Sequence, residues 1–118
     1  MRRIYCMSCN IIVTPEFSRS LKKLAKHYKS MKDDFASFLD QLRENPWMGT
    51  DLGQGLHKIR LSITSKGKGK SGGARVITLV TVHTDENDQV LLLAIYDKSE
   101  RENLSDKELK DLLYRYSL

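Results

Sequence analysis

A run of basic residues with no acidic neighbour occupies the middle of this 118-residue chain. Between His57 and Arg75 there are six Lys or Arg residues and no Asp or Glu. Lys58 and Arg60 stand two positions apart, which places both on one face of a strand, and Arg75 opens the next strand-like segment. We expect Arg75 to join the other two if the hairpin register brings it opposite them. The three would then form a cation cluster with no obvious carboxylate to neutralise it.

Such a cluster suits phosphate chemistry. Cations on an open sheet face attract a polyanion and stabilise the additional negative charge of a pentacovalent phosphate. A lysine among like charges also releases its proton more readily, so it can act as a proton acceptor. We favour RNA over duplex DNA because the chain shows no recognition helix or dimer motif. Two plainer interpretations stay open: chance clustering in a chain of net charge +5, and surface cations that protect a strand edge from aggregation.

Three further lysines, Lys66, Lys68 and Lys70, alternate with glycine in the segment SKGKGKSGG, residues 65–73. Its GKS letters match the end of a P-loop, but the first glycine of that motif should fall at Thr64, and a strand follows instead of a helix. A simple hinge explains the glycines and not the lysines. Glycine lets the backbone pass close to a ligand, and a phosphate backbone needs charge more than shape. The segment is therefore predicted to be a basic RNA-binding loop.

Two helices are predicted ahead of this basic region. Thr14 is a favourable N-cap for the first helix, with Pro15 at its first position. The second helix is predicted to start at Ser30 and to stop before Pro46. Apolar residues repeat at helical spacing in both segments. The predicted inward stripes are Phe17, Leu21, Leu24, Ala25 and Tyr28 in the first helix, and Phe35, Phe38, Leu39 and Leu42 in the second.

The remaining segments indicate strands and one last helix. Residues 10–13 form a short apolar strand, and Ile59, Leu61 and Ile63 alternate with polar residues. Segments 75–83 and 89–96 predict two more strands, which complete an antiparallel meander whose central strand is buried on both faces. Residues 84–88 are a polar hairpin connection. The predicted fold class is α+β, with the helices on one face of the sheet and the other face partly free. Ser105 and Glu108 form a capping box for the last helix, whose inward stripe is Leu109, Leu112, Leu113 and Tyr116.

The composition and length of the chain limit the classes of protein to which it can belong. We expect residues 1–9 to be an N-terminal extension that need not be ordered and residues 10–118 to be a single domain. No apolar stretch is long enough to cross a bilayer, so we expect a cytoplasmic protein with no membrane contact. Cys6 and Cys9 have C-x-x-C spacing but no second ligand pair, so no metal or cofactor is predicted. A two-histidine ribonuclease built from His57 and His83 is less favoured, because the two lie at the ends of different strands.

Two stretches resemble a known family. GLHKIRLSITSKGKGKSGGARVITL (55–79) and LLLAIYDKSERENLSDKEL (91–109) resemble the RelE/ParE superfamily of toxin–antitoxin toxins. The GKGKSGG loop and the Y-x-K-x-E-R-x-x-L-S segment are similar to the HigB-like branch. The resemblance covers nearly all of the chain after Met7. It implies a RelE-like fold, with a small antiparallel-rich sheet, an N-terminal helical hairpin and a C-terminal helix. It also implies a type II toxin that acts as a ribosome-dependent, metal-independent mRNA endonuclease.

The resemblance also implies residue roles and partners. In the family chemistry a ribose 2′-OH attacks the adjacent phosphate and leaves a 2′,3′-cyclic phosphate. Lys58 and Arg60 would supply proton-transfer and phosphate-binding cations, Arg75 would stabilise the transition state, and Lys98 would add a further cation. The expected partners are an acidic antitoxin, the ribosome and mRNA. Two rivals stay open: a ParE-like gyrase inhibitor that acts by protein contact, and a catalytically weakened RNA-binding relative. The predicted RNA-binding residues are Lys66, Lys68, Lys70, Tyr96 and Arg101.

The chain departs from the RelE pattern at two positions. Ser99 stands where RelE-type toxins carry an arginine, and Ser105 stands where they carry a tyrosine near the start of the last helix. Glu100 and Arg101 are candidates to compensate for these changes. A stacking role for Tyr96 on an RNA base competes with a plainer role in covering the core at a strand end.

Overall fold

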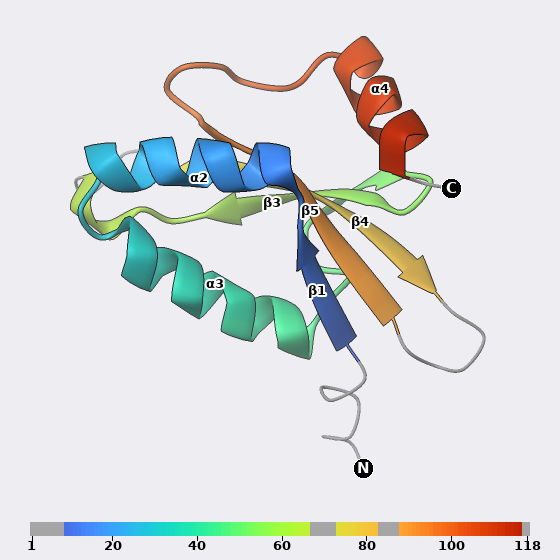
Figure 1. The fold of residues 1–118 in the computed structure, drawn as a ribbon, viewed down its shortest axis with the longest axis horizontal. Helices are drawn as coiled ribbons and strands as arrows, with labels where there is room; N and C mark the ends of the chain where they lie inside the picture. The colour runs from blue at the N-terminus through green and yellow to red at the C-terminus, as the bar shows by residue number, and fades with distance from the viewer. Residues whose placement is uncertain (1–8, 67–72, 83–87, 117–118) are drawn as a thin grey trace.

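A five-stranded sheet with three helices forms the described part of the chain (Figure 1). The computed structural model describes residues 9–66, 73–82 and 88–116. The strand order is β1-β5-β4-β3-β2, and the mixed α+β architecture confirms the predicted fold class. In chain order the elements are β1 (Cys9–Val13), α2 (Pro15–His27), α3 (Met31–Glu44), β2 (Thr50–Gly53), β3 (Leu56–Leu61), the 3-10 turn η1 (Thr64–Lys66), β4 (Ala74–Val82), β5 (Asp88–Asp97) and α4 (Asp106–Tyr116).

The centre of the sheet is the predicted antiparallel meander. Strands β3, β4 and β5 pair consecutively, and β4 is buried from Ala74 to Val80, which confirms its central position. Strand β1 adds to β5 in parallel at one edge. Strand β2 at the other edge was not predicted: its four residues are all exposed and include a glycine, so no alternation of polar and apolar side chains marked it. The predicted connection at 84–87 and residues 1–8 lie outside the described residues.

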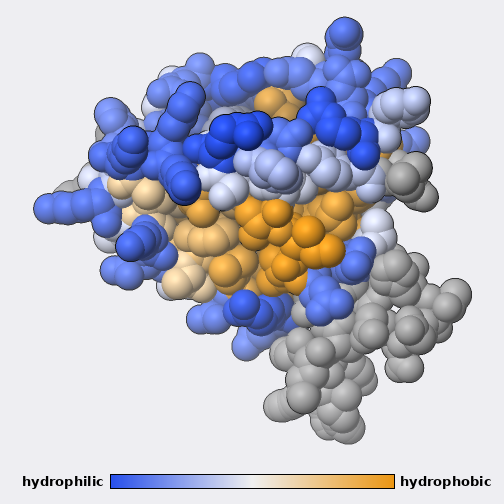
Figure 2. Space-filling model, viewed as in Figure 1, coloured by the Kyte–Doolittle hydropathy of each residue, from blue (hydrophilic) through white to orange (hydrophobic). Residues whose placement is uncertain are grey.

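Both N-terminal helices form where they were predicted, and the predicted N-cap of α2 is confirmed. Thr14 Oγ1 accepts a hydrogen bond from Phe17 N at 3.3 Å and donates one to Leu92 O at 2.8 Å, so the cap also ties α2 to β5. Helices α2 and α3 lie across the same face of the sheet and bury Phe17, Met31, Phe38 and Leu42 against it. Figure 2 shows a continuous apolar area between the two helices, bordered by hydrophilic residues.

The C-terminal helix packs on the opposite face, so the prediction that all helices share one face is wrong. Its leucines cover a second apolar cluster formed by Leu56, Ile77, Leu79 and Leu93. The physical cause is that β4 and β5 are apolar on both faces, and each face needs its own cover. A bulge adds to this: Ile77 pairs with Ala94 and Thr78 with Leu92, which leaves Leu93 as the extra residue of β5.

Helix α4 is held by polar contacts at both of its ends. The predicted capping box is confirmed, because Ser105 N donates to Glu108 Oε1 at 2.8 Å and Glu108 N donates to Ser105 Oγ at 3.1 Å. At the other end Tyr116 and Arg115 donate to Glu16 of α2. These hydrogen bonds, that of Tyr116 first, hold the pKa of Glu16 below its usual range.

A carboxylate anchors the 3-10 turn that follows β3. Thr64 N and Oγ1 donate to the two oxygens of Asp34 at 2.8 and 2.7 Å, and Ser30 Oγ donates to the same carboxylate at 2.6 Å. Although burial alone would raise the pKa of Asp34, these bonds leave it below its usual range. The turn is therefore fastened to the start of α3. None of the described helices is long and apolar enough to span a membrane.

Candidate active site

The register of β3 and β4 brings three predicted catalytic residues together. Arg60 pairs directly with Arg75, and Lys58 lies one pair further along the same face, opposite Ile77. Ile59 between the two cations packs into the core under α2 and α3, so Lys58 and Arg60 point to the opposite face. The prediction that Arg75 joins them across the hairpin is confirmed.

A cavity of about 320 Å³ opens where these side chains meet. It is lined by all four predicted catalytic residues, since Lys98 reaches it from the end of β5. Cations from β3, β4 and the segment after β5 therefore converge on one space, although up to 40 positions separate them in the sequence. Among the described residues the lining is Thr50, Lys58, Arg60, Arg75, Lys98, Glu102 and Asn103.

Three lining residues were not predicted: Thr50 of the unpredicted strand β2, and Glu102 and Asn103. Lys58 Nζ donates to Asn103 Oδ1 at 2.6 Å, and Lys98 Nζ lies 3.7 Å from Glu102 Oε2. The expectation of a cluster without a carboxylate is therefore wrong. Glu102 and Asn103 lie in the irregular segment between β5 and α4, where no periodicity indicates which side chains face inward. Their place depends on how the chain turns after β5.

Arg75 is held most firmly of the four cations. Its side chain belongs to a residue only 7% exposed, and its Nη1 donates to Ala74 O at 3.1 Å. Arg60, its direct cross-strand partner, is exposed. A guanidinium fixed in place needs little reorganisation when negative charge develops beside it. The pair thus combines one preorganised cation with one that is accessible to solvent.

Comparisons with known proteins identify the family of this chain. The family model described as the RelE toxin of the RelE/RelB toxin–antitoxin system matches residues 17–115. The chain belongs to the RelE toxin family. The structure is also similar to that of an E. coli toxin RelE mutant in the free state, with a TM-score of 0.54 and 15% sequence identity. That similarity covers 91% of this chain and 96% of the other, and it confirms the RelE-like fold. The HigB-like branch stays a prediction.

In this RelE-family toxin a buried carboxylate shapes the turn that carries Lys98. Asp97 is 3% exposed, and its Oδ2 accepts a hydrogen bond from Tyr28 Oη at 2.6 Å. Its Oδ1 accepts bonds from Ser99 N and Ser99 Oγ at 2.9 and 2.7 Å. Lys98 N donates to Gly73 O at 3.1 Å, next to the start of β4. The bond to Asp97, followed by burial, raises the pKa of Tyr28 to about 12. Ser99, one of the two departures from the RelE pattern, therefore has a structural role.

Tyr96 and Arg101 lie beside the cavity but do not line it. Arg101 Nη2 is 2.7 Å from Glu108 Oε1, and the guanidinium carbon lies 5.9 Å from the centroid of the Tyr96 ring. This contact, followed by the bond from Ser105 N, lowers the pKa of Glu108 to about 2. Tyr96 packs on the apolar cluster under α4, and burial raises its pKa. Tyr96 therefore covers the core, which is the plainer of its two predicted roles. RNA binding by Tyr96 or Arg101 stays a prediction.

The three lysines of the basic loop cannot be placed in this geometry. The backbone of Lys66 ends η1, whereas Lys68 and Lys70 lie outside the described residues. His83 lies outside them as well, so the two-histidine arrangement is untested. His57 is buried, and its ring contacts Trp47 edge-on, with the ring centroids 5.6 Å apart. Among the described residues no group of three or more His, Cys, Asp or Glu could hold a metal ion.

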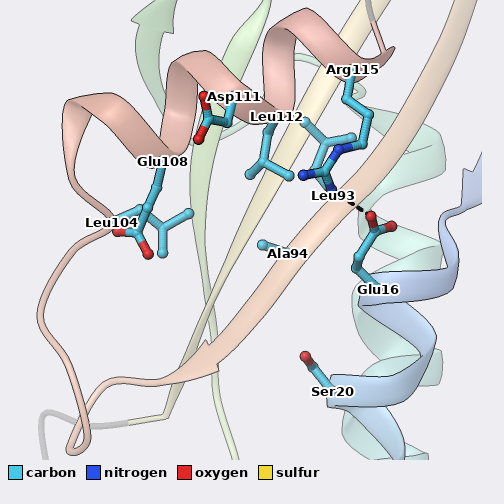
Figure 3. Close-up of a pocket in the computed structure, with 9 residues that line it drawn as sticks. All are labelled: Glu16, Ser20, Leu93, Ala94, Leu104, Glu108, Asp111, Leu112 and Arg115. Carbon is cyan, nitrogen blue, oxygen red and sulfur yellow. Dashed lines mark hydrogen bonds and ion pairs between the residues drawn. The ribbon is translucent and has the colours of Figure 1, made fainter.

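A second cavity, of about 250 Å³, has the opposite chemistry (Figure 3). It lies between α4 and α2 over β5, and Figure 3 shows Leu112 of α4 projecting toward the strand that carries Leu93 and Ala94. Three acids, Glu16, Glu108 and Asp111, line it together with a single cation, Arg115. Because an acidic rim repels phosphate, this second cavity is less suited to a nucleic acid than the cationic cavity at the end of β3 and the start of β4.

Proposed function

We propose that this toxin is a ribosome-dependent mRNA endonuclease that needs no metal ion. The observation that carries the proposal is the convergence of Lys58, Arg60, Arg75 and Lys98 on one cavity. In the proposed reaction the ribose 2′-OH attacks the adjacent phosphorus, the bond to the 5′-oxygen breaks, and a 2′,3′-cyclic phosphate remains. Arg60 and Arg75 would stabilise the phosphorane charge, a task that a metal ion performs in other nucleases.

The composition of the cavity supports a dependence on the ribosome. Among the described residues its lining holds four cations but no aromatic side chain on which a base could stack, and no histidine. Such a site binds the phosphate backbone but does little to arrange a 2′-OH in line with its leaving group. Holding the reacting groups in that arrangement is worth a large rate factor, and the ribosome can supply it by fixing the mRNA.

The proposed partner of the toxin is a protein antitoxin with an acidic binding segment. The exposed side of α2 carries Arg19, Lys22, Lys23 and Lys26, and it borders the apolar area between α2 and α3 (Figure 2). An amphipathic segment with an acidic polar face would match that surface. Alternatively, the antitoxin would cover the cationic cavity directly. Either contact would bring negative charge to a basic surface of the toxin.

The decisive experiment adds purified toxin to a reconstituted translation reaction and maps the 5′ ends of the mRNA. We expect cuts in mRNA held on ribosomes and little cutting of the same RNA when it is free, with or without divalent metal. The Arg75→Ala protein serves as control for contaminating nuclease. Rapid metal-dependent degradation of free RNA would contradict the proposal. Inhibition of gyrase supercoiling without any RNA cleavage would instead favour the rival reading as a protein-contact inhibitor.

A further inference from the structure

A cut made by 2′-OH attack needs a group that removes the hydroxyl proton, and the cavity offers few candidates. Arginine stays protonated at all working pH values, so Arg60 and Arg75 cannot serve. Thr50 and the amide of Asn103 are not bases. The choice among the described lining residues therefore lies between the two lysines and Glu102.

The contacts of both lysines use their Nζ protons. Lys58 Nζ donates to Asn103 Oδ1 at 2.6 Å. Lys98 Nζ lies 3.7 Å from Glu102 Oε2. A lysine ammonium group has three protons to donate and no acceptor, so it must lose a proton before it can take one.

Glu102 needs no such preparation, because a carboxylate is ionised and can accept a proton at neutral pH. Its side chain is 75% exposed and its single ion pair is long, so no packing prevents it from turning toward a bound ribose. It lines the same cavity as Lys58 and Arg75, and it lies beside one proton donor, Lys98. Resting on the proposed endonuclease function, we propose that Glu102 is the general base that removes the 2′-OH proton.

The step balances within the cavity. Glu102 takes the 2′-OH proton, and the oxygen lone pair forms the new bond to phosphorus. The bond from phosphorus to the 5′-oxygen breaks, and its electron pair stays on that oxygen. The Lys58 ammonium then protonates the 5′-oxygen. The proton on Glu102 returns to Lys58 through solvent, so the protein ends in its starting protonation state. Asn103 acts as a positioning residue in this scheme, because it holds Lys58.

The proposal predicts opposite effects of Glu102 on binding and on chemistry. A carboxylate repels the RNA phosphate, so Glu102→Gln should leave the half-saturating toxin concentration unchanged or lower it. The saturated single-turnover rate on ribosome-bound mRNA should fall at least about a hundredfold, the loss expected for a general base. Glu44→Gln is the matched control, since this exposed acid ends α3 on the other face of the sheet and does not line the cavity. It should cleave at the wild-type rate.

A modified substrate distinguishes the role of Glu102 as general base from that of Lys58 as general acid. In an mRNA with sulfur in place of the 5′-bridging oxygen, the leaving group departs without protonation. The Glu102→Gln defect should persist on this substrate, whereas the Lys58→Ala defect should shrink. A Glu102→Gln protein that cleaves as fast as wild type, or faster, would overturn the proposal and leave the endonuclease function intact. If wild-type protein cuts no ribosome-bound mRNA, the proposed function itself fails, and the assignment of Glu102 fails with it.

Discussion

The two faces of the sheet use the same strands for different purposes. On the face under α2 and α3, Ile59 of β3 and Val76 of β4 are almost completely buried in an apolar core. On the opposite face their immediate neighbours, Lys58, Arg60 and Arg75, line the cationic cavity. Because side chains alternate along a strand, each cation is next in sequence to a core residue and points to the opposite face of the sheet. The site therefore lies on the opposite face of the strands that form the core.

The cavity face is itself divided. Helix α4 covers the part formed by Ile77, Leu79 and Leu93. No described helix covers the end of β3 and the start of β4, where the cavity opens. The segment between β5 and α4 crosses that open part and contributes Glu102 and Asn103. The apolar part needs a helix for its stability, and the charged part needs access for its ligand. The two faces can therefore be separated experimentally by choosing neighbouring residues on one strand.

The largest effect is expected from the core side. Ile59→Ala removes a side chain that is 2% exposed and should lower the free energy of unfolding by about 2–5 kcal/mol. Urea denaturation measures this loss. In conditions where the variant is still folded, its saturated cleavage rate should stay near that of wild type, since Ile59 does not line the cavity. A folded Ile59→Ala protein with a large rate defect would show that the two faces are coupled more tightly than the comparison suggests.

Arg75→Ala tests the same strand pair from the cavity side. The saturated single-turnover rate should fall by about a hundredfold, or about 2.7 kcal/mol, because one preorganised donor to the transition state is lost. Ribosome binding should be nearly unchanged. Arg19→Ala, which removes an exposed arginine of α2 on the other face, is the control and should keep the full rate. If Arg75→Ala loses binding and keeps its saturated rate, Arg75 holds RNA and takes no part in the chemistry.

Much of this division was predictable because it depends on local patterns. The alternation of Lys58, Ile59 and Arg60 predicted both the strand and the face on which its cations lie. The capping side chains of Thr14 and Ser105 predicted the starts of α2 and α4, since a cap needs only its own backbone. The pairing of Arg75 with Arg60 needed one further assumption, a regular hairpin register, and the structure satisfies it.

The rest depends on contacts between distant segments. Helix α4 has an apolar stripe, but nothing in its own sequence tells which face of the sheet that stripe covers. Glu102 and Asn103, which line the cavity, follow a turn that is held by hydrogen bonds between Ser99 and Asp97. Tyr28 was placed correctly in the inward stripe of α2, yet its hydroxyl bonds to Asp97, 69 positions away. Periodicity in the sequence predicts that a residue faces inward, but it does not predict the hydrogen-bond partner of that residue's polar atom.

Tyr28 joins the two regions, because it lies on the core side and fixes the turn that carries Lys98. Tyr28→Phe removes the bond to the Asp97 carboxylate and should lower the free energy of unfolding at pH 8 by about 1–2 kcal/mol. The saturated cleavage rate should fall by less than about tenfold, since Lys98 keeps its backbone bond to Gly73. A rate defect as large as that of Arg75→Ala would place the turn among the main determinants of catalysis.

The pH dependence of the free energy of unfolding tests the hydrogen bond between Tyr28 and Asp97 directly. Folded Tyr28 keeps its proton up to a pKa of about 12, whereas the tyrosine of the unfolded chain loses it near the ordinary value of 10. Between these values the unfolded state binds fewer protons, so the contribution of Tyr28 is complete below pH 10 and is lost as the pH rises toward 12. In urea titrations from pH 9 to 12, wild type should therefore lose stability more steeply than Tyr28→Phe, and the two curves should converge. Tyr114→Phe is the matched control, because Tyr114 is 88% exposed, and it should follow wild type throughout. Parallel curves for wild type and Tyr28→Phe would mean that the bond to Asp97 does not hold the Tyr28 proton in the folded protein.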